Sequence, residues 1–369
     1  MELIDYLQLI VKSEASDLFI TVGSPPALKI NGNLTLHGNE PIKPEDALAL
    51  ANAIMSTDQQ KLFAQHLELN LAISKPGLGR FRVNLFHQRN QIAIVFRYIR
   101  SEIPSLDDLH LPPILKQLSL VKRGLILVVG ATSTGKTTTL ASMIEYRNQQ
   151  QAGHIITIED PIEFTFTHKK SIINQREVGV DTLSYGDALK NTLRQAPDAI
   201  LIGEIRTREI MNYALTFSET GHLCLSTLHA ANANQALERI ISFFPRETHD
   251  QLLLELSTNL AAIICQRLIP TVDHKRAAAV EILIATPLVR DFIRRNEIDK
   301  LKGVMESSED VGMQTLDSSL FQLYQAGRIT AEEALRYADS SNNLRLKMNT
   351  KGINPPISNA NLELKNKDE

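Results

Sequence analysis

Residues 125–144, LILVVGATSTGKTTTLASMI, decide the fold class of this 369-residue chain. Gly130, Gly135, Lys136 and Thr137 fill every fixed position of the pattern G-x-x-x-x-G-K-[ST]. The apolar run before the loop predicts a buried strand, and the residues after it predict a helix. In this strand–loop–helix context, backbone N–H groups and a helix N-terminus bind phosphate groups. The sequence therefore predicts an α/β domain that binds a nucleoside triphosphate.

The loop also supplies the predicted contacts to the nucleotide. The ammonium of Lys136 is expected on the β- and γ-phosphates, and the hydroxyl of Thr137 is expected to ligate Mg²⁺. Such a loop contacts phosphates only, so it does not decide between ATP and another nucleoside triphosphate. The residues predicted to bind the nucleotide are Ser133, Thr134, Gly135, Lys136, Thr137 and Thr138.

An acidic segment follows the next predicted strand in HIITIEDPIEF, residues 154–164. A carboxylate at the carboxyl end of a strand near a phosphate-binding loop is suited to orient an attacking water. Pro161 turns the chain, so Glu163 can point back toward the nucleotide. A solvated acidic loop is the alternative, and the residues alone leave it open.

A second acidic box, APDAILIGEIR (residues 196–206), ends an apolar strand in Gly203 and Glu204. It resembles a Walker B strand, whose terminal acid holds the Mg²⁺ shell or polarises water. The usual acid is Asp, whereas this chain has Glu204 at that position. Asp198 lies at the other end of the strand and is a poor candidate.

The third box, ETGHLCLSTLHA (residues 219–230), places His222 and His229 at opposite ends of an apolar strand. His229 follows the carboxyl end, where it can sense the γ-phosphate. His222 is expected to face a neighbour or the sheet edge. An ordinary core histidine is the alternative for both. A zinc site of His222, Cys224 and His229 is disfavoured because its ligands would sit at opposite ends of one strand.

The chain before the loop predicts a smaller α+β domain over residues 1–100. This part is expected to contain a helix near residues 3–10, a strand at 17–22, an Asn-Gly hairpin, a helix pair at 43–65 and two strands within 79–100. A Pro- and Ser-rich linker is expected at 101–113, and an α/β domain with a largely parallel sheet at 114–346. Helices are expected at 249–265, 286–306 and 313–338 as a C-terminal helical cap. Residues 347–369 are polar and predict a disordered tail.

Three arginines lie on two consecutive predicted strands of the first domain. Arg80 and Arg82 share one face, opposite Phe81 and Val83, because side chains alternate along a strand. Arg97 is expected on the same face of the next strand. These guanidiniums can supply charge to a nucleotide held by another domain or subunit, and a solvated basic face is the alternative.

The composition argues against several classes of protein and of binding site. Lys and Arg number 39 against 42 Asp and Glu, a net charge of −3, which argues against a nucleic-acid partner. Two cysteines cannot form a four-cysteine zinc site, and both lie in apolar runs, so we expect them to be buried and reduced. The first residues lack a basic secretory signal, and no apolar run approaches ~20 residues, so a cytoplasmic location is expected.

Four motifs follow one another in the order found in the secretion and pilus motor ATPases: the loop, the IEDPIE segment, the GE strand end and TGH…TLH. These ATPases are a RecA-like family that works as hexameric rings. The chain resembles the type IV pilus retraction, or twitching-motility, branch (PilT and PilU). GRFRVNLFHQRN, GMQTLDSSLFQLY and AEEALRYADSSNNL also fit. The stretches GHIITIEDPIE and QREVGVDTLSYGDALKNTLRQAPD favour the PilU sub-branch. The resemblance covers nearly the whole chain and implies a PAS-like first domain and a RecA-like second domain.

The resemblance implies roles for individual residues. Glu163 would be the catalytic glutamate, Glu204 the Walker B glutamate near Mg²⁺, and His222 and His229 the histidine pair. Arg82 and Arg97, with Arg80, would be arginine fingers, and Arg290 and Arg294 lie in a helix associated with pulling. One departure is Ser133, which stands where the family usually has Gly and places a Cβ near the phosphates.

The resemblance also implies the setting of the activity. It implies Mg²⁺-dependent ATP hydrolysis by a homo-hexamer that powers pilus retraction. The partners would be an inner-membrane platform protein, which brings the ring to the membrane, and a PilT-type paralogue. The alternative is a weakly hydrolysing accessory ring component that assists that second motor. Assembly ATPases of the family usually carry a four-cysteine metal site, which two cysteines cannot form.

Overall fold

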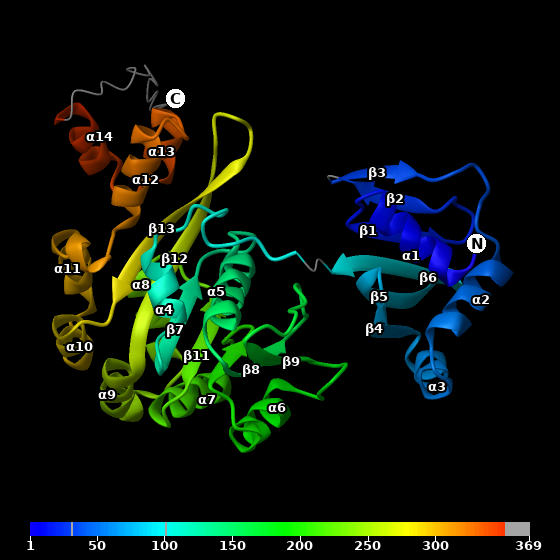
Figure 1. Ribbon diagram of the computed structural model, residues 1–369, viewed down its shortest axis with the longest axis horizontal. Helices are drawn as coiled ribbons and strands as arrows, with labels where there is room; N and C mark the ends of the chain where they lie inside the picture. Colours follow the sequence, from blue (N-terminus) through cyan, green and yellow to red (C-terminus); the bar gives the residue numbers. More distant parts are fainter. Residues whose placement is uncertain (31, 100–101, 351–369) are drawn as a thin grey trace, which may run out of the picture. The chain divides into compact units, whose positions relative to one another are not determined.

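Figure 1 shows the chain as a computed structural model, which describes residues 1–30, 32–99 and 102–350. The chain divides into two compact units. One contains Met1–Ser105 with Ala141–Ile205, and the other contains Leu106–Leu140 with the residues from Arg206 onward. These units differ from the domains expected from the sequence, whose boundaries stay a prediction.

A six-stranded antiparallel sheet forms from the first hundred residues, in the order β3-β2-β1-β6-β5-β4. Its strands are β1 (Asp17–Thr21), β2 (Ala27–Ile30), β3 (Asn33–Leu36), β4 (Glu68–Lys75), β5 (Gly79–Gln88) and β6 (Gln91–Ile99). Its helices are α1 (Leu3–Lys12), α2 (Pro44–Ile54) and α3 (Thr57–His66). The helix near the N-terminus, the hairpins and the helix pair are confirmed, whereas β4 was not predicted from the sequence.

Alternation of apolar and polar residues determines which face of this sheet is buried. Phe81, Val83 and Leu85 of β5 are fully buried and belong to a core that also holds Leu7 and Ile10 of α1. The residues between them on β5 point to the opposite face. The period-two pattern of the sequence thus fixes which side chains of β5 remain on the outer face.

A second sheet has seven strands in the order β13-β12-β7-β11-β10-β8-β9. The strands are β7 (Gly124–Val129), β8 (Gly153–Glu159), β9 (Ser171–Glu177), β10 (Ala199–Ile202), β11 (Leu223–Leu228), β12 (Leu260–Pro270) and β13 (Arg276–Ile284). β7 runs parallel to β11 and β12, β8 runs parallel to β10 and β9, and β12–β13 is an antiparallel hairpin. Every residue of β7, β10 and β11 is buried, as expected for parallel strands with both faces covered. The predicted largely parallel sheet is confirmed.

Helices occupy most of the remaining chain from residue 114 to residue 350. The α-helices are α4 (Ile114–Ser119), α5 (Lys136–Gln150), α6 (Tyr185–Thr192), α7 (Arg208–Glu219), α8 (Ala233–Ser242), α9 (His249–Asn259), α10 (Pro287–Arg294), α11 (Leu301–Ser307), α12 (Leu316–Gln325), α13 (Ala331–Tyr337) and α14 (Ser341–Thr350). Short 3₁₀ turns are η1 (Leu193–Gln195), η2 (Arg246–Thr248), η3 (Ile298–Lys300) and η4 (Glu309–Val311). Within the described residues, no helix combines the length and apolar character needed to cross a bilayer.

The helix predicted over residues 249–265 is wrong in its second half. α9 ends at Asn259, and Leu260 begins the long strand β12. Most apolar residues on both sides of this junction are buried, so the helical and strand segments have the same hydrophobic appearance. The strands β9 and β13 were not predicted from the sequence either.

The predicted tail begins inside a helix. α14 extends to Thr350, and its Leu344 and Met348 are buried with α12, α13 and the β12–β13 hairpin in one apolar core. Figure 1 shows these three helices together at the C-terminal end of the described chain. The first four residues assigned to the tail are therefore ordered because Met348 packs in this core, while the rest of the predicted tail lies outside the described residues.

Both cysteines are buried and unpaired, as predicted. Cys265 lies on β12, and its Sγ donates to the carbonyl of Ala231 at 2.9 Å. Burial raises the pKa of this thiol to about 12, so it stays protonated at neutral pH. Across residues 1–30, 32–99 and 102–350, no group of three or more His, Cys, Asp or Glu side chains is placed to hold a metal ion.

The packing of α14 leads to a test. Met348→Ala should lower the free energy of unfolding by about 2–3 kcal/mol, because it empties a fully buried site. Leu346→Ala, on the same helix at a side chain that is 63% exposed, should change it by less than ~0.5 kcal/mol. Urea unfolding of the full chain measures both, and equal effects would show that α14 does not pack as described.

Candidate functional site

The loop between β7 and α5 adopts a backbone that only glycine accommodates at two positions. Gly130 and Gly135 have φ values of +156° and +84°. A Cβ on Gly130 would lie 2.6 Å from the carbonyl oxygen of Gln266, and one on Gly135 would lie 2.8 Å from the Gln266 Nε2. Both glycines of the motif are therefore required by φ, and Gly130 is required in addition by its close contact with the backbone of β12.

Ser133 also lies in the left-handed region, with φ +63°, and it is exposed at the tip of the loop. A serine in this conformation carries strain of roughly 1 kcal/mol that a glycine would not. The next residue, Thr134, closes the turn, because its Oγ1 donates to the carbonyl of Ala131 at 2.9 Å. The loop therefore holds a tight turn in spite of Ser133.

Lys136 begins α5 and extends back over the loop. Its Nζ donates to the carbonyls of Gly130 at 3.0 Å and Ala131 at 2.7 Å. The side chain is 9% exposed, so a cation is held over the positive end of the helix. Thr137 and Thr138 are half-buried on the first turn of the same helix. The Lys136 cation, the N-terminus of α5 and the glycine turn together are suited to bind a chain of phosphates.

A cavity of about 410 Å³ adjoins this loop. Gly135, Thr138 and Thr139 form the loop side, and the residues 108–111 and Arg328 form other walls. Its volume lies in the range of small-molecule sites. The loop thus has space beside it for the rest of a nucleotide.

The two predicted histidines lie at opposite ends of β11. The backbone N–H of Gly130 contacts the carbonyl of Leu228 at 3.4 Å, so the next residue, His229, follows the strand end beside the start of the loop. His222 precedes the strand, and its Nδ1 lies 3.0 Å from the Thr220 hydroxyl and 3.2 Å from the Phe217 carbonyl. Six strand residues separate the two positions by ~20 Å. The two histidines therefore lie at opposite ends of the strand, as the sequence predicts, and His222 stabilises the turn after α7.

Glu159 ends β8 and is buried. Its Oε1 accepts from the Thr157 hydroxyl at 2.6 Å and from the Gln175 Nε2 at 3.3 Å. Burial raises the pKa of Glu159 to about 7, and the nearby carboxylates of Glu163 and Glu177 add to this shift. The residues Glu159 and Glu163 are thus placed in different environments, the first buried and the second exposed.

Gln175 of β9 holds the segment that carries Glu163. Its Nε2 donates to the carbonyl of Phe164 at 2.8 Å, and its Oε1 accepts from the N–H of Phe166 at 2.9 Å. This two-sided contact fixes the backbone immediately after Glu163. No sequence motif pointed to this glutamine, because a single polar residue in an unpredicted strand carries no pattern.

Glu204 follows β10, as the sequence predicts, and is half-buried. The preceding Gly203 donates its N–H to the carbonyl of Ile158 at 2.8 Å. A Cβ on Gly203 would lie 2.8 Å from the hydroxyl of Tyr185, so this strand end also depends on a glycine. The close approach fixes the backbone from which Glu204 projects.

The predicted arginine face is confirmed in its geometry. Arg82 and Arg97 lie directly opposite each other on β5 and β6, which places both side chains on one face. The Arg97 Nε donates to the buried Asp17 at 2.7 Å, and the Arg80 Nη2 lies 3.3 Å from the buried Glu177. Among the described residues, Arg82 has no hydrogen-bond or ion-pair partner. Two of the three guanidiniums therefore have carboxylate partners.

The arginines of the LVRDFIRR segment differ in their surroundings. The Arg290 guanidinium donates to the carbonyls of Ala285 at 2.9 Å, Ser257 at 2.6 Å and Leu260 at 3.0 Å. It therefore ties α10 to the carboxyl end of α9, where helix carbonyls lack partners of their own. Arg294 lies on the surface and pairs with Asp291 at 3.2 Å.

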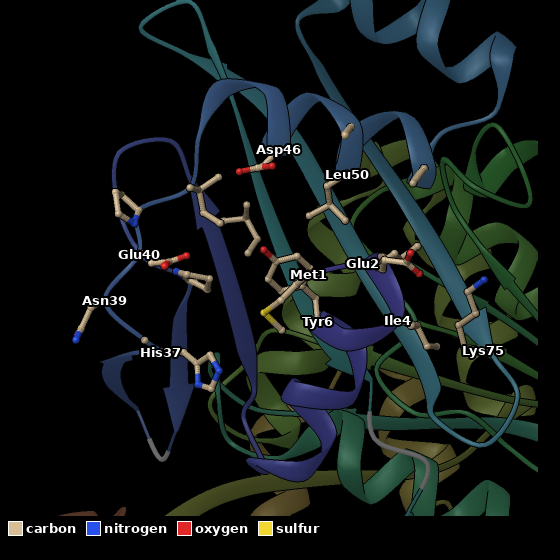
Figure 2. Close-up of a pocket in the computed structure, with 18 residues that line it drawn as sticks. Met1, Glu2, Ile4, Tyr6, His37, Asn39, Glu40, Asp46, Leu50 and Lys75 are labelled. Atoms are coloured by element: carbon tan, nitrogen blue, oxygen red, sulfur yellow. The ribbon is translucent and has the colours of Figure 1, made fainter.

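A second cavity, of about 810 Å³, lies among the N-terminal helices and strands. Figure 2 shows Met1 and Tyr6 of the first segment at its centre, with His37 and Glu40 on one side and Asp46 of α2 above. None of the residues that the sequence predicts to bind or hydrolyse nucleotide lines this cavity. Its lining residues therefore share no member with the cavity beside the loop.

Comparison with known proteins agrees with this geometry. The family model described as "Type II/IV secretion system protein" matches residues 3–352. The chain is 54% identical to the type IV pilus ATPase PilU of Pseudomonas aeruginosa, over 94% of this chain and 91% of that protein. It is 40% identical to the type IV pilus retraction ATPase PilT of the same organism, over 90% and 97% of the two chains.

Solved structures show the same fold. The crystal structure of the pilus retraction motor PilT with bound ADP matches with a TM-score of 0.85 and 40% identity, over 92% of this chain and 98% of that chain. The ATPase DotB of Legionella pneumophila matches with a TM-score of 0.77 at 24% identity, a likeness of fold alone. The predicted RecA-like fold with a smaller N-terminal domain is confirmed. The chain belongs to the type II/IV secretion system protein family, in the branch of the PilT and PilU pilus ATPases.

Proposed function

We propose that this chain hydrolyses ATP with Mg²⁺ and, as a hexameric motor, powers the retraction of a type IV pilus. The observation that carries the proposal is the loop of residues 130–136. Its glycines make the tight turn, and Lys136 holds a buried cation over the N-terminus of α5. The 54% identity to a type IV pilus ATPase over 94% of the chain supports the biological setting.

The loop residues Ser133–Thr138 bind the phosphates in this proposal, with Lys136 providing the positive charge. Thr137 and Glu204 would hold Mg²⁺, which when bound would neutralise phosphate charge. Glu163 orients the attacking water, and His229 senses the terminal phosphate. Glu163 is suited to its role because it is exposed and its backbone is fixed by Gln175, whereas Glu159 is buried.

The arginines supply charge to the transition state. Arg82 and Arg97 share one face of the N-terminal sheet, and we assign both as arginine fingers acting between subunits. Asp17 holds Arg97 in a fixed direction through a 2.7 Å hydrogen bond. A face of guanidiniums on a module distinct from the loop is suited to contact a nucleotide held by a neighbouring copy.

The proposed setting follows the family. The ring acts in the cytoplasm, and it reaches the inner membrane through a platform protein of the pilus machine. Residues 1–100 act as one module and residues 114–346 as the other, joined by the linker 101–113. A PilT-type paralogue is a further proposed partner, since the chain is related to both PilU and PilT.

A second candidate is an accessory ring component that hydrolyses ATP weakly and assists a PilT-type motor. The observation that favours it is the left-handed φ of +63° at Ser133, in the loop that must close on the phosphates. Strain and an extra Cβ at this point slow turnover more than they weaken binding. The relationship to PilU at 54% identity supports the same candidate.

Lys136→Ala tests the main proposal. Removing the ammonium should lower phosphate release from ATP by at least ~100-fold, because the terminal phosphates lose their cation. Lys61→Ala is the control, since Lys61 is exposed and pairs with Asp58 on α3. Equal phosphate release by Lys136→Ala and the unchanged chain, with both folded by circular dichroism, would refute the proposal.

Ser133→Gly tests the second candidate. Glycine takes φ +63° without strain, so the variant should be stabilised by roughly 1 kcal/mol and should release phosphate several-fold faster. Ser133→Ala keeps the Cβ and should show neither gain. If Ser133→Gly and Ser133→Ala turn over at the same rate, the strain at Ser133 does not limit hydrolysis and this candidate loses its support.

The buried carboxyl of Glu159 predicts a pH dependence of stability. The pKa of Glu159 in the folded chain, about 7, exceeds the ordinary value of 4.5. The contribution of this carboxyl to the free energy of unfolding is therefore fully present below pH 4.5 and is lost as pH rises through 7. Glu159→Gln stays neutral at every pH. The free energy of unfolding of this variant minus that of the unchanged chain should therefore be larger at pH 8.5 than at pH 4.5, by up to roughly 3 kcal/mol. Urea unfolding at several pH values measures this gain, with the exposed Glu306→Gln as control. A difference that does not change with pH would contradict the assignment.

A further inference from the structure

Gln266 is a buried amide that contacts the loop from outside its sequence motif. It lies on β12 and is 3% exposed. Its Nε2 donates to the carbonyl of Thr134 at 2.8 Å, and its Oε1 accepts from the hydroxyl of Thr139 at 2.7 Å. Both ends of the amide are thus used, one on the loop and one on α5.

The register of the sheet explains how this residue reaches the loop. β12 runs parallel to β7, and Cys265 lies opposite Val129, the last residue of β7. Residue 266 is therefore level with Gly130, where the loop begins. The backbone oxygen of Gln266 approaches Gly130 and its side-chain Nε2 approaches Gly135, so this one residue packs against both glycines of the loop.

The contact with Thr134 determines the direction of the loop backbone. A loop that binds an anion through its N–H groups must turn its carbonyls away from the anion. A carbonyl turned into the protein needs a donor there, and the Gln266 Nε2 provides one for Thr134. The hydroxyl of Thr139 fixes the other end of the amide and so the direction of the donor.

We propose that Gln266 is a positioning residue that holds the loop in its phosphate-binding shape before the nucleotide arrives. A loop already in the bound shape loses less conformational freedom on binding, so its affinity is higher. This inference rests on the proposed role of the loop as the phosphate site. It assigns a function to a residue of β12, 130 positions after the lysine of the motif.

Four substitutions separate this role from simple packing. Gln266→Leu removes both hydrogen bonds at similar volume, and Gln266→Glu keeps the acceptor for Thr139 but places a carboxylate against the Thr134 carbonyl. Thr139→Val removes one bond, and Thr139→Ser retains it. Gln314→Leu is the matched control, because the Gln314 Nε2 also donates to a backbone carbonyl, that of Val280 at 2.8 Å, away from the loop.

The readout is the Kd of the full chain for ADP by isothermal titration calorimetry, with the unfolding temperature measured beside it. We expect Gln266→Leu and Gln266→Glu to raise Kd about 5- to 30-fold, which corresponds to the loss of one or two hydrogen bonds at a buried site. Thr139→Val should raise Kd about 3-fold, and Thr139→Ser should restore it. Gln314→Leu should lower the unfolding temperature without changing Kd.

ADP binding by Lys136→Ala separates a wrong role for Gln266 from a wrong role for the loop. If Lys136→Ala abolishes ADP binding while Gln266→Leu and Gln266→Glu bind within twofold of the unchanged chain, Gln266 has no positioning role. If either Gln266 variant does not fold, equal Kd values for Thr139→Val and Thr139→Ser would overturn the inference in the same way. If Lys136→Ala binds ADP normally, the loop is not the phosphate site and the proposed function fails first.

Discussion

The structure around the loop depends on one steric constraint, the absence of side-chain atoms at Gly130 and Gly135. A Cβ on Gly130 would lie 2.6 Å from the backbone oxygen of Gln266, so a side chain there would push the loop away from β12, and Gly135 is needed for its φ of +84°. With glycine there, the loop packs on the strand, Thr134 receives its donor, and Lys136 extends back over the turn. The shape of the loop between β7 and α5 therefore depends on its contacts with Gln266 of the neighbouring strand β12.

Burial distinguishes the acidic residues that follow the strands. Glu159 is enclosed at the end of β8, where burial and neighbouring carboxylates raise its pKa to about 7. Glu163, four residues later, is exposed on a segment that Gln175 fixes through two backbone contacts. Two of the arginines are oriented by carboxylates, since Asp17 pairs with Arg97 and Glu177 pairs with Arg80. Polar partners thus set the direction of charged groups that the proposed chemistry uses.

Local patterns predicted much of this fold, and long-range contacts account for what they missed. The G-x-x-x-x-G-K-T loop, the all-apolar strands and the alternation on β5 are visible within ten or so residues. The junction of α9 and β12 was misassigned because an apolar run looks alike in a buried helix and a buried strand. Gln266 and Gln175 could not be found from sequence, because each acts on a segment distant along the chain. Met348 was placed in a tail because its apolar neighbours are on other helices.

The most direct measurement of the central claim is a structure of the full chain with Mg²⁺ and a non-hydrolysable ATP analogue. The account predicts that the phosphates lie on the backbone N–H groups of the loop. The Lys136 Nζ should then leave the carbonyls of Gly130 and Ala131 for the phosphate oxygens, while the Gln266 amide stays on Thr134. A nucleotide bound elsewhere, such as in the N-terminal cavity of Figure 2, or a Lys136 still on those carbonyls, would contradict it.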